Sequence, residues 1–179
     1  MTFRALIESL ASEIAFEAKD ELLGEVGELV QAEHASVRLM DRIRGSLGRY
    51  IDIGIATGKY RARLIDSGVN WVLVEIGQHD YIVPLHAIRS VVGLGVAVGE
   101  TERFPRTLNM VLRAVLGEYI AITTGEFDIS GELVAVGHDY CLVSQLAARQ
   151  TYSWDENKSS ASETYVPLAA IITIRSGTN

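Results

Sequence analysis

The chain has 179 residues, of which 48% are hydrophobic and 22% charged, so it can bury a core and is not expected to be disordered. Its 23 acidic and 16 basic residues give a net charge of −7, which disfavours binding to polyanions by the chain as a whole. A lone cysteine, Cys141, excludes an internal disulfide and favours a cytoplasmic location. Glu8, Glu13 and Glu17 interrupt the stretch that a signal peptide would need, and no 18-residue apolar run occurs, so no membrane association is expected.

Residues 1–37 are expected to form an acidic N-terminal helical arm. Apolar residues recur at helical spacing through residues 3–18, which predicts an amphipathic helix. In residues 21–38, Gly24 and Gly27 interrupt the pattern, and a helix is the prediction there as well. The apolar stripe of the first helix needs a partner, which is either the rest of the same chain or another protein, including a second copy.

The charge is unevenly distributed, because residues 38–63 carry seven basic and two acidic groups. Such a density forms a phosphate-attracting surface if the side chains share one face. The alternatives are a solvated surface, or a face neutralised by the acidic arm. The candidate nucleic-acid face consists of Arg42, Arg44, Arg49, Lys59, Arg61 and Arg63.

The most informative feature is an internal repeat. Shifting the sequence by 69 positions aligns residues 39–74 with residues 108–143 without a gap, and 11 of the 36 aligned positions are identical. After a 14-residue insertion in the second copy, the match resumes with Val83-Pro84-Leu85 against Val166-Pro167-Leu168. Two long copies indicate a tandem of one small folding unit and not a solenoid, which needs more and shorter units.

Each copy reads as one short helix followed by five short strands. In the first copy, Leu39, Ile43 and Leu47 have helical spacing, and Gly48 reads as the helix C-cap, as Gly117 does in the second copy. β-Branched and aromatic runs separated by turn residues then predict strands. These strands are expected at Arg49 to Ile55, Tyr60 to Ile65, Asn70 to Ile76, Tyr81 to Val83 and Ile88 to Val92.

Strands this short are expected to form a bent sheet that closes on itself. In the second copy, the segment Gly125-Glu-Phe-Asp-Ile-Ser-Gly131-Glu-Leu133 resembles the first motif of the Sm-like family of small barrels. Gly131 would sit in a strongly bent strand where a Cβ would collide with a neighbour, and Ala62 takes its place in the first copy. The Val-Pro-Leu-x-Ala-Ile segment also resembles the closing strand of PRC-barrel domains, so the barrel subtype is left open.

The resemblance implies a mainly β (α+β) fold with an N-terminal helix and tandem five-stranded Sm-like barrels, each preceded by a short helix. The residues that hold a uridine base in Sm-like proteins are absent, because Gly137 and Cys141 stand at those positions, as do Gly68 and Val72 in the first copy. The order of an acidic helix, the segment Leu39-Met40-Asp41-Arg42 and two barrels with Val-Pro-Leu resembles a group of uncharacterised actinobacterial proteins. This resemblance covers nearly the full chain.

The expected domain organisation follows from the repeat. It comprises the arm at 1–37, a first barrel at 38–95, a linker at 96–107, and a second barrel at 108–179 with an insertion at 149–163. Within this polar insertion, Tyr152 and Trp154 are candidate partner contacts, since an exposed aromatic on a loop is a frequent contact residue. The alternative is that Trp154 folds back on the barrel.

No pattern in the chain indicates catalysis. The histidines, His34, His79, His86 and His138, occur singly and without metal-ligand spacing, so neither a metal nor another cofactor is expected. His79 and His138 each precede an aspartate at a predicted turn, where a backbone role outweighs an acid or base role. Cys141 lies in an apolar strand, where a thiol is normally unreactive.

Two hypotheses of function remain. The first is a non-enzymatic protein-interaction or scaffolding module that binds a protein partner or itself, since small barrels leave short strand edges available for pairing. The second is a nucleic-acid-binding regulator that uses the basic segment 38–63, which the net charge and the missing base pocket disfavour.

Overall fold

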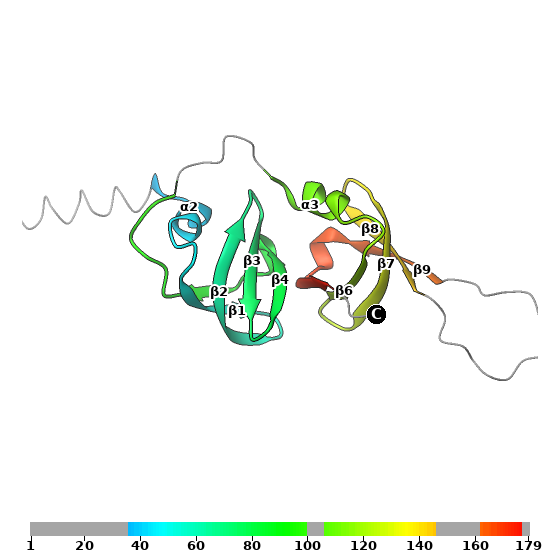
Figure 1. The fold of residues 1–179 in the computed structure, drawn as a ribbon, viewed down its shortest axis with the longest axis horizontal. Coiled ribbons are helices and arrows are strands. Elements are labelled where there is room, and N and C mark those ends of the chain that lie inside the picture. The colour runs from blue at the N-terminus through cyan, green and yellow to red at the C-terminus, as the bar shows by residue number, and fades with distance from the viewer. Residues whose placement is uncertain (1–35, 100–105, 146–161, 177–179) are drawn as a thin grey trace, which may run out of the picture. The chain divides into compact units, whose positions relative to one another are not determined.

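The described part of the chain is mainly β, and its first element is a short helix (Figure 1). The computed structural model describes residues 36–99, 106–145 and 162–176, and the described part of Leu39–Asn179 forms one compact unit. The helix predicted at 3–18 and nearly all of the segment 21–38 lie outside the described residues. The predicted domain boundaries stay predictions.

The first group of elements follows the order predicted from the sequence. It consists of α2 (Leu39–Arg44), β1 (Tyr50–Ile55), β2 (Gly58–Ser67), β3 (Trp71–Ile76), β4 (His79–Pro84), the 3₁₀ turn η1 (Leu85–Ala87) and β5 (Ser90–Val92). All five strands are present, although β2 and β4 are longer than predicted. The turn η1 was not predicted, because its three residues carry no periodic signal.

The second group repeats that order along the chain. It consists of α3 (Leu108–Ala114), β6 (Tyr119–Thr123), β7 (Asp128–Val136), β8 (Tyr140–Gln145), β9 (Ser162–Pro167), η2 (Leu168–Ala170) and β10 (Thr173–Ser176). Thr107 caps α3, its side chain accepting a hydrogen bond from the Met110 amide. Each helix leads into its first strand through a glycine with positive φ, Gly48 at 81° and Gly117 at 84°. Because α2 and α3 end at Arg44 and Ala114, these glycines close the turn after the helix and are not its immediate C-caps.

The ten strands of the described residues belong to one antiparallel sheet with the order β5-β1-β2-β3-β4-β10-β6-β7-β8-β9. The two groups join where β4 pairs with β10, Ile82 lying opposite Ile174 and Tyr81 opposite Arg175. The prediction of two closed five-stranded barrels is therefore wrong, and the sheet is open. Strand β5 pairs with β1 and not with β4 of its own group, while the second edge of β4 is taken by a strand of the other group.

The second strand of each group carries a β-bulge, an irregularity that bends a strand. The register between β2 and β3 shifts at Ile65, and that between β7 and β8 shifts at Val134, 69 residues later. A Cβ on Gly131 would lie 2.3 Å from the carbonyl oxygen of Ser144, so the steric reason predicted for this glycine is confirmed. Ala62, at the equivalent place in β2, is completely buried.

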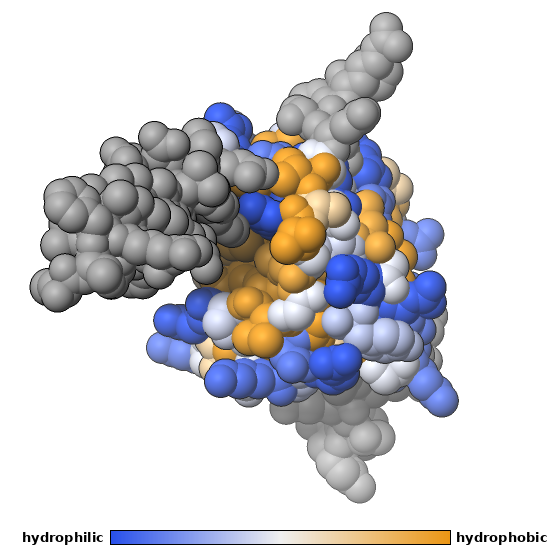
Figure 2. All heavy atoms as spheres, turned by 90° about the vertical axis from the view of Figure 1, so that its left-hand side faces the viewer, coloured by the Kyte–Doolittle hydropathy of each residue, from blue (hydrophilic) through white to orange (hydrophobic). Residues whose placement is uncertain are grey.

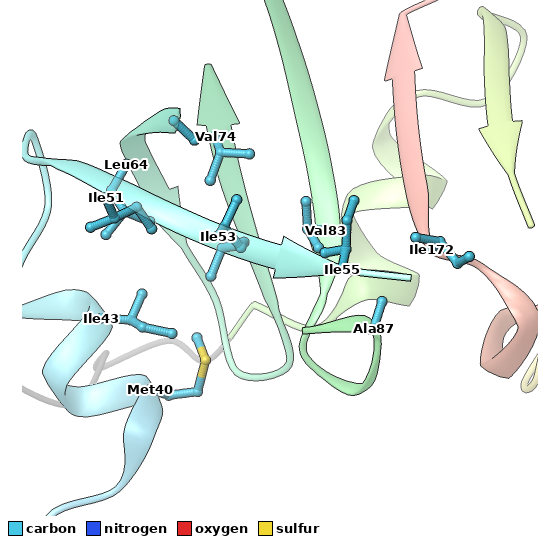
Figure 3. Close-up of a cluster of buried hydrophobic side chains, with 12 residues drawn as sticks. Met40, Ile43, Ile51, Ile53, Ile55, Leu64, Val74, Val83, Ala87 and Ile172 are labelled. Atoms are coloured by element: carbon cyan, nitrogen blue, oxygen red, sulfur yellow. The ribbon is translucent and has the colours of Figure 1, made fainter. Parts of the chain in front are cut away.

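Two apolar cores lie under the sheet, and each receives a side chain from the other group. In the first, α2 places Met40 and Ile43 against the aliphatic side chains of β1 to β4, and Ile172 joins them from the second group (Figure 3). In the second, α3 places Leu108 and Leu112 against β6 to β9, and Trp71 joins them from β3. The exchange of Ile172 and Trp71 packs the two groups together at the β4–β10 seam.

Candidate interaction edges and basic face

Three of the six basic residues that were predicted to form a nucleic-acid face lie on one face of the sheet. Lys59, Arg61 and Arg63 alternate along β2 and are exposed, while the residues between them point towards the core. Asp52 accepts a hydrogen bond from Arg61 at 3.2 Å, and Glu75 lies 4.0 Å from Arg63. This row of cations is therefore flanked by carboxylates of the neighbouring strands, which lowers its attraction for a polyanion.

The other predicted basic residues are not part of that row. Arg44 is largely buried, pairs with Asp41 at 2.9 Å and also reaches the carbonyl of Gly68. Arg42 donates a hydrogen bond to the carbonyl of Val96, which fastens α2 to the segment after β5. Arg49 is exposed just before β1.

The predicted partner contacts Tyr152 and Trp154, like His34, lie outside the described residues. Apolar side chains are nonetheless exposed elsewhere, as the orange surface between hydrophilic patches in Figure 2 illustrates. Two of the most exposed lie on the terminal strands of the sheet, Val92 on β5 at 62% and Tyr165 on β9 at 64%. The rings of Tyr165 and Tyr140, 5.4 Å apart, form an aromatic pair beside the β9 edge.

An ion pair anchors the connector between the two groups. The guanidinium of Arg106 donates to both carboxylate oxygens of Asp66, at 2.6 and 2.9 Å, and to the carbonyl of Ser67. The indole N–H of Trp71 donates to the Arg106 carbonyl at 3.0 Å, and the guanidinium lies over the indole ring. These contacts fix the start of the second group against β3.

Asp66 is expected to make stability depend on pH. Its hydrogen bond with Arg106 holds the pKa of Asp66 below the ordinary value of 3.8, although burial acts in the opposite direction. Its contribution to folding is therefore present above pH 3.8 and is lost as the pH falls through the lowered folded-state pKa.

We expect Asp66→Asn to reduce the free energy of unfolding by about 1 kcal/mol at neutral pH, since both partners are partly exposed. Chemical unfolding between neutral and acid pH should show this difference shrink below pH 3.8. The control Asp52→Asn removes the exposed Arg61 pair and should change stability little. A deficit of Asp66→Asn that stays constant into strong acid would contradict the assignment.

A groove of about 450 Å³ lies beside the β4–β10 seam. Leu73, Ile82, Leu112 and Ile174 give it apolar walls, and its charged lining residues are Asp80 of β4, Glu118 before β6 and Arg175 of β10. Nothing in the described residues shows a ligand chemistry for it.

The remaining candidate residues take structural places. The Nε2 atom of His86 lies 3.0 Å from the carbonyl oxygen of Ile171, across the seam between the groups. Cys141 is fully buried, and desolvation raises its pKa to about 11, so its reactive thiolate form is strongly disfavoured. Among residues 36–99, 106–145 and 162–176, no three His, Cys, Asp or Glu side chains gather as metal ligands would. Helices in this part of the chain are also too short or too polar to cross a membrane.

Comparison with known proteins adds no family assignment, since neither a family model nor a curated protein matches the chain. The resemblance to Sm-like, PRC-barrel and actinobacterial proteins stays a prediction from the sequence.

Proposed function

We propose that this chain is a non-enzymatic, cytoplasmic protein-interaction module that binds extended segments at the edges of its sheet. The observation that carries the proposal is the pair of terminal strands, β5 and β9, which pair on one side only within the described part of the chain. Each presents a large apolar side chain, Val92 or Tyr165, that is more than half exposed.

An open edge strand binds because its backbone N–H and C=O groups on one side are unpaired. An added strand satisfies these groups, and neighbouring side chains supply specificity. Sheets that avoid such association place lysine or proline on the edge, whereas β5 reads Ser-Val-Val and β9 reads Ser-Glu-Thr-Tyr-Val-Pro, with its proline only at the end. We interpret the two groups as a tandem duplication, which supplies one open edge at each end of the sheet.

Selection of strand-length random peptides on the full chain tests this function. We expect peptides that bind the wild-type chain and lose at least about tenfold affinity, or 1.4 kcal/mol, on Tyr165→Lys or Val92→Lys. The control Val134→Lys changes a residue that is 45% exposed on the interior strand β7 and should leave binding unchanged. Failure to select peptides, or equal binding to all variants, would contradict the proposal.

Nucleic-acid binding is the second candidate, favoured by the row of Lys59, Arg61 and Arg63 on one face. Anisotropy of labelled RNA and duplex DNA at about 50 and 200 mM salt tests it, since phosphate contacts require a steep loss of affinity. Binding that Arg61→Glu with Arg63→Glu abolishes would favour this candidate, and its absence at the lower salt would exclude it. The neighbouring Asp52 and Glu75 make absence the expected result.

A further inference from the structure

The seam inside the chain shows what each open edge can bind. Residues 39–74 correspond to 108–143 at a spacing of 69, and the strand register extends this correspondence. Leu73 lies opposite Ile82 as Leu142 lies opposite Tyr165, so Ile82 and Tyr165 are equivalent. Strand β9 is therefore the counterpart of β4.

The same comparison identifies β5 as the counterpart of β10. Ile53 lies opposite Val91, and its equivalent Ile122 lies opposite Ile174. The two strands that pair at the internal seam, β4 and β10, thus correspond to the two that are open, β9 and β5.

We propose that β9 of one chain pairs with β5 of a second copy, in the register that joins β4 to β10 within the chain. Tyr165 of one copy then lies opposite Val91 of the next, and Thr164 lies opposite Val92, as Ile82 and Tyr81 lie opposite Ile174 and Arg175. This inference rests on the proposed function and names a second copy of the chain as the partner that binds each open edge.

Side chains that are buried at the internal seam have exposed counterparts at the open edges. Trp71 is 3% exposed and packs in the second core, whereas its equivalent, Tyr140, is 38% exposed beside Tyr165. Leu108, in the same core, is 2% exposed, whereas the identical residue at the equivalent position, Leu39, is 47% exposed. A second copy that docks in the internal register would cover both Tyr140 and Leu39.

A polar contact of the seam can also be repeated. The Asn70 side chain accepts a hydrogen bond from the Leu108 amide at 2.9 Å. Its equivalent, Asp139, is exposed and can accept from the amide of Leu39 in the second copy. The contact of His86 with the Ile171 carbonyl cannot be repeated between copies, because Ala169 stands at the position of His86 in the second group.

The pairing joins two different edges, so each added copy covers one open edge and supplies its other edge, and a chain of copies keeps one open β5 and one open β9 at its ends. Such a head-to-tail contact builds a closed ring or a filament and not a two-fold dimer. Within the chain, the short connector holds the two groups at an effective concentration in the millimolar range, whereas separate chains have no connector. Association between chains should therefore depend on concentration.

Sedimentation equilibrium of the full chain, up to about 1 mM, measures this association. We expect the mass of the wild-type protein to rise above the 19.6 kDa of one chain. Tyr165→Lys and Val91→Lys each place a charge where the internal seam pairs the apolar residues Ile82 and Ile174, so each destroys one edge. Each variant should stay monomeric alone, and an equal mixture should form a dimer through the two intact edges. The control Val134→Lys should associate like the wild type.

Ala169→His tests the same contact without weakening the fold, because Ala169 is exposed. The new histidine can bond the Ile88 carbonyl of the second copy, which is the counterpart of Ile171. It should tighten association about three- to tenfold. A wild-type chain that is monomeric at about 1 mM would overturn the inference. So would self-association of the Val91→Lys or Tyr165→Lys variant alone, or weaker association of Ala169→His.

The two proposals fail in different ways. A monomeric wild-type chain that still binds edge-directed peptides overturns the second copy as occupant and leaves the interaction function intact. A monomeric chain without peptide binding overturns both.

Discussion

Trp71→Ala is expected to lower the free energy of unfolding by about 3–5 kcal/mol, the usual range for removing a buried tryptophan. The indole is 3% exposed, fills the second core from a strand of the first group, and donates a hydrogen bond to the Arg106 carbonyl. Its loss leaves a cavity at the seam and removes one hydrogen bond to the Arg106 carbonyl, which still accepts from the Val69 amide. Urea unfolding followed by circular dichroism measures the change.

The repeat supplies the matched control for this prediction. Tyr140→Ala removes the equivalent aromatic residue, which is 38% exposed at the β9 edge, and should cost about 1 kcal/mol or less in the isolated chain. Equal costs for Trp71→Ala and Tyr140→Ala in dilute monomer would show that the seam does not bury Trp71 as described.

Gly131→Ala is expected to destabilise the chain by about 2–3 kcal/mol, because β7 and β8 approach too closely there for a side chain. The added Cβ would lie 2.3 Å from the Ser144 carbonyl oxygen and 2.8 Å from a methyl group of Val143. Since the first of these is a backbone atom, the strands themselves must move apart. Thermal and urea unfolding of the variant measure the loss.

Gly125→Ala is the control for the same chemical change. A Cβ there meets nothing within 4 Å, so the substitution should be neutral, or stabilising by up to about 1 kcal/mol through the unfolded chain. Similar stability of both alanine variants would contradict the close approach at Gly131.

Local features of the fold could be predicted from the sequence because they depend on neighbouring residues. β-Branched and aromatic runs between turn residues predicted the strands, and the repeat predicted that both groups share one order of elements. The need for glycine at Gly131 followed from the bend of its strand. Closure into two barrels was predicted wrongly, since short strands indicate curvature but do not specify which distant edge pairs with β4.

Open strand edges were expected from the sequence, but the strands and residues that form them were not predicted, for a related reason. Leu39 and Leu108 are identical residues at equivalent positions, yet one is 47% exposed and the other 2%, because only Leu108 shares a core with Trp71. Local pattern gives both the same prediction. The signal for Tyr165 was present in the repeat, but its equivalence to Ile82 required the strand register. The basic segment was only partly brought together, because its members lie on a helix, a turn and a strand.

The register between two copies can be measured directly with a disulfide. Directly opposite residues of antiparallel strands have Cα atoms about 4.5–5.5 Å apart, within the range that a disulfide spans. Native Cys141 does not interfere, since it is fully buried and its thiol has a pKa of about 11. We therefore expect Val92→Cys and Thr164→Cys chains, mixed and mildly oxidised, to form a covalent dimer.

The neighbouring variant Glu163→Cys is shifted by one residue and points to the opposite face of the strand, so it should crosslink to Val92→Cys far more slowly. Rapid crosslinking at Thr164 and not at Glu163 is the predicted result. Equal rates at both positions, or no crosslink at either, would contradict the pairing of β5 with β9.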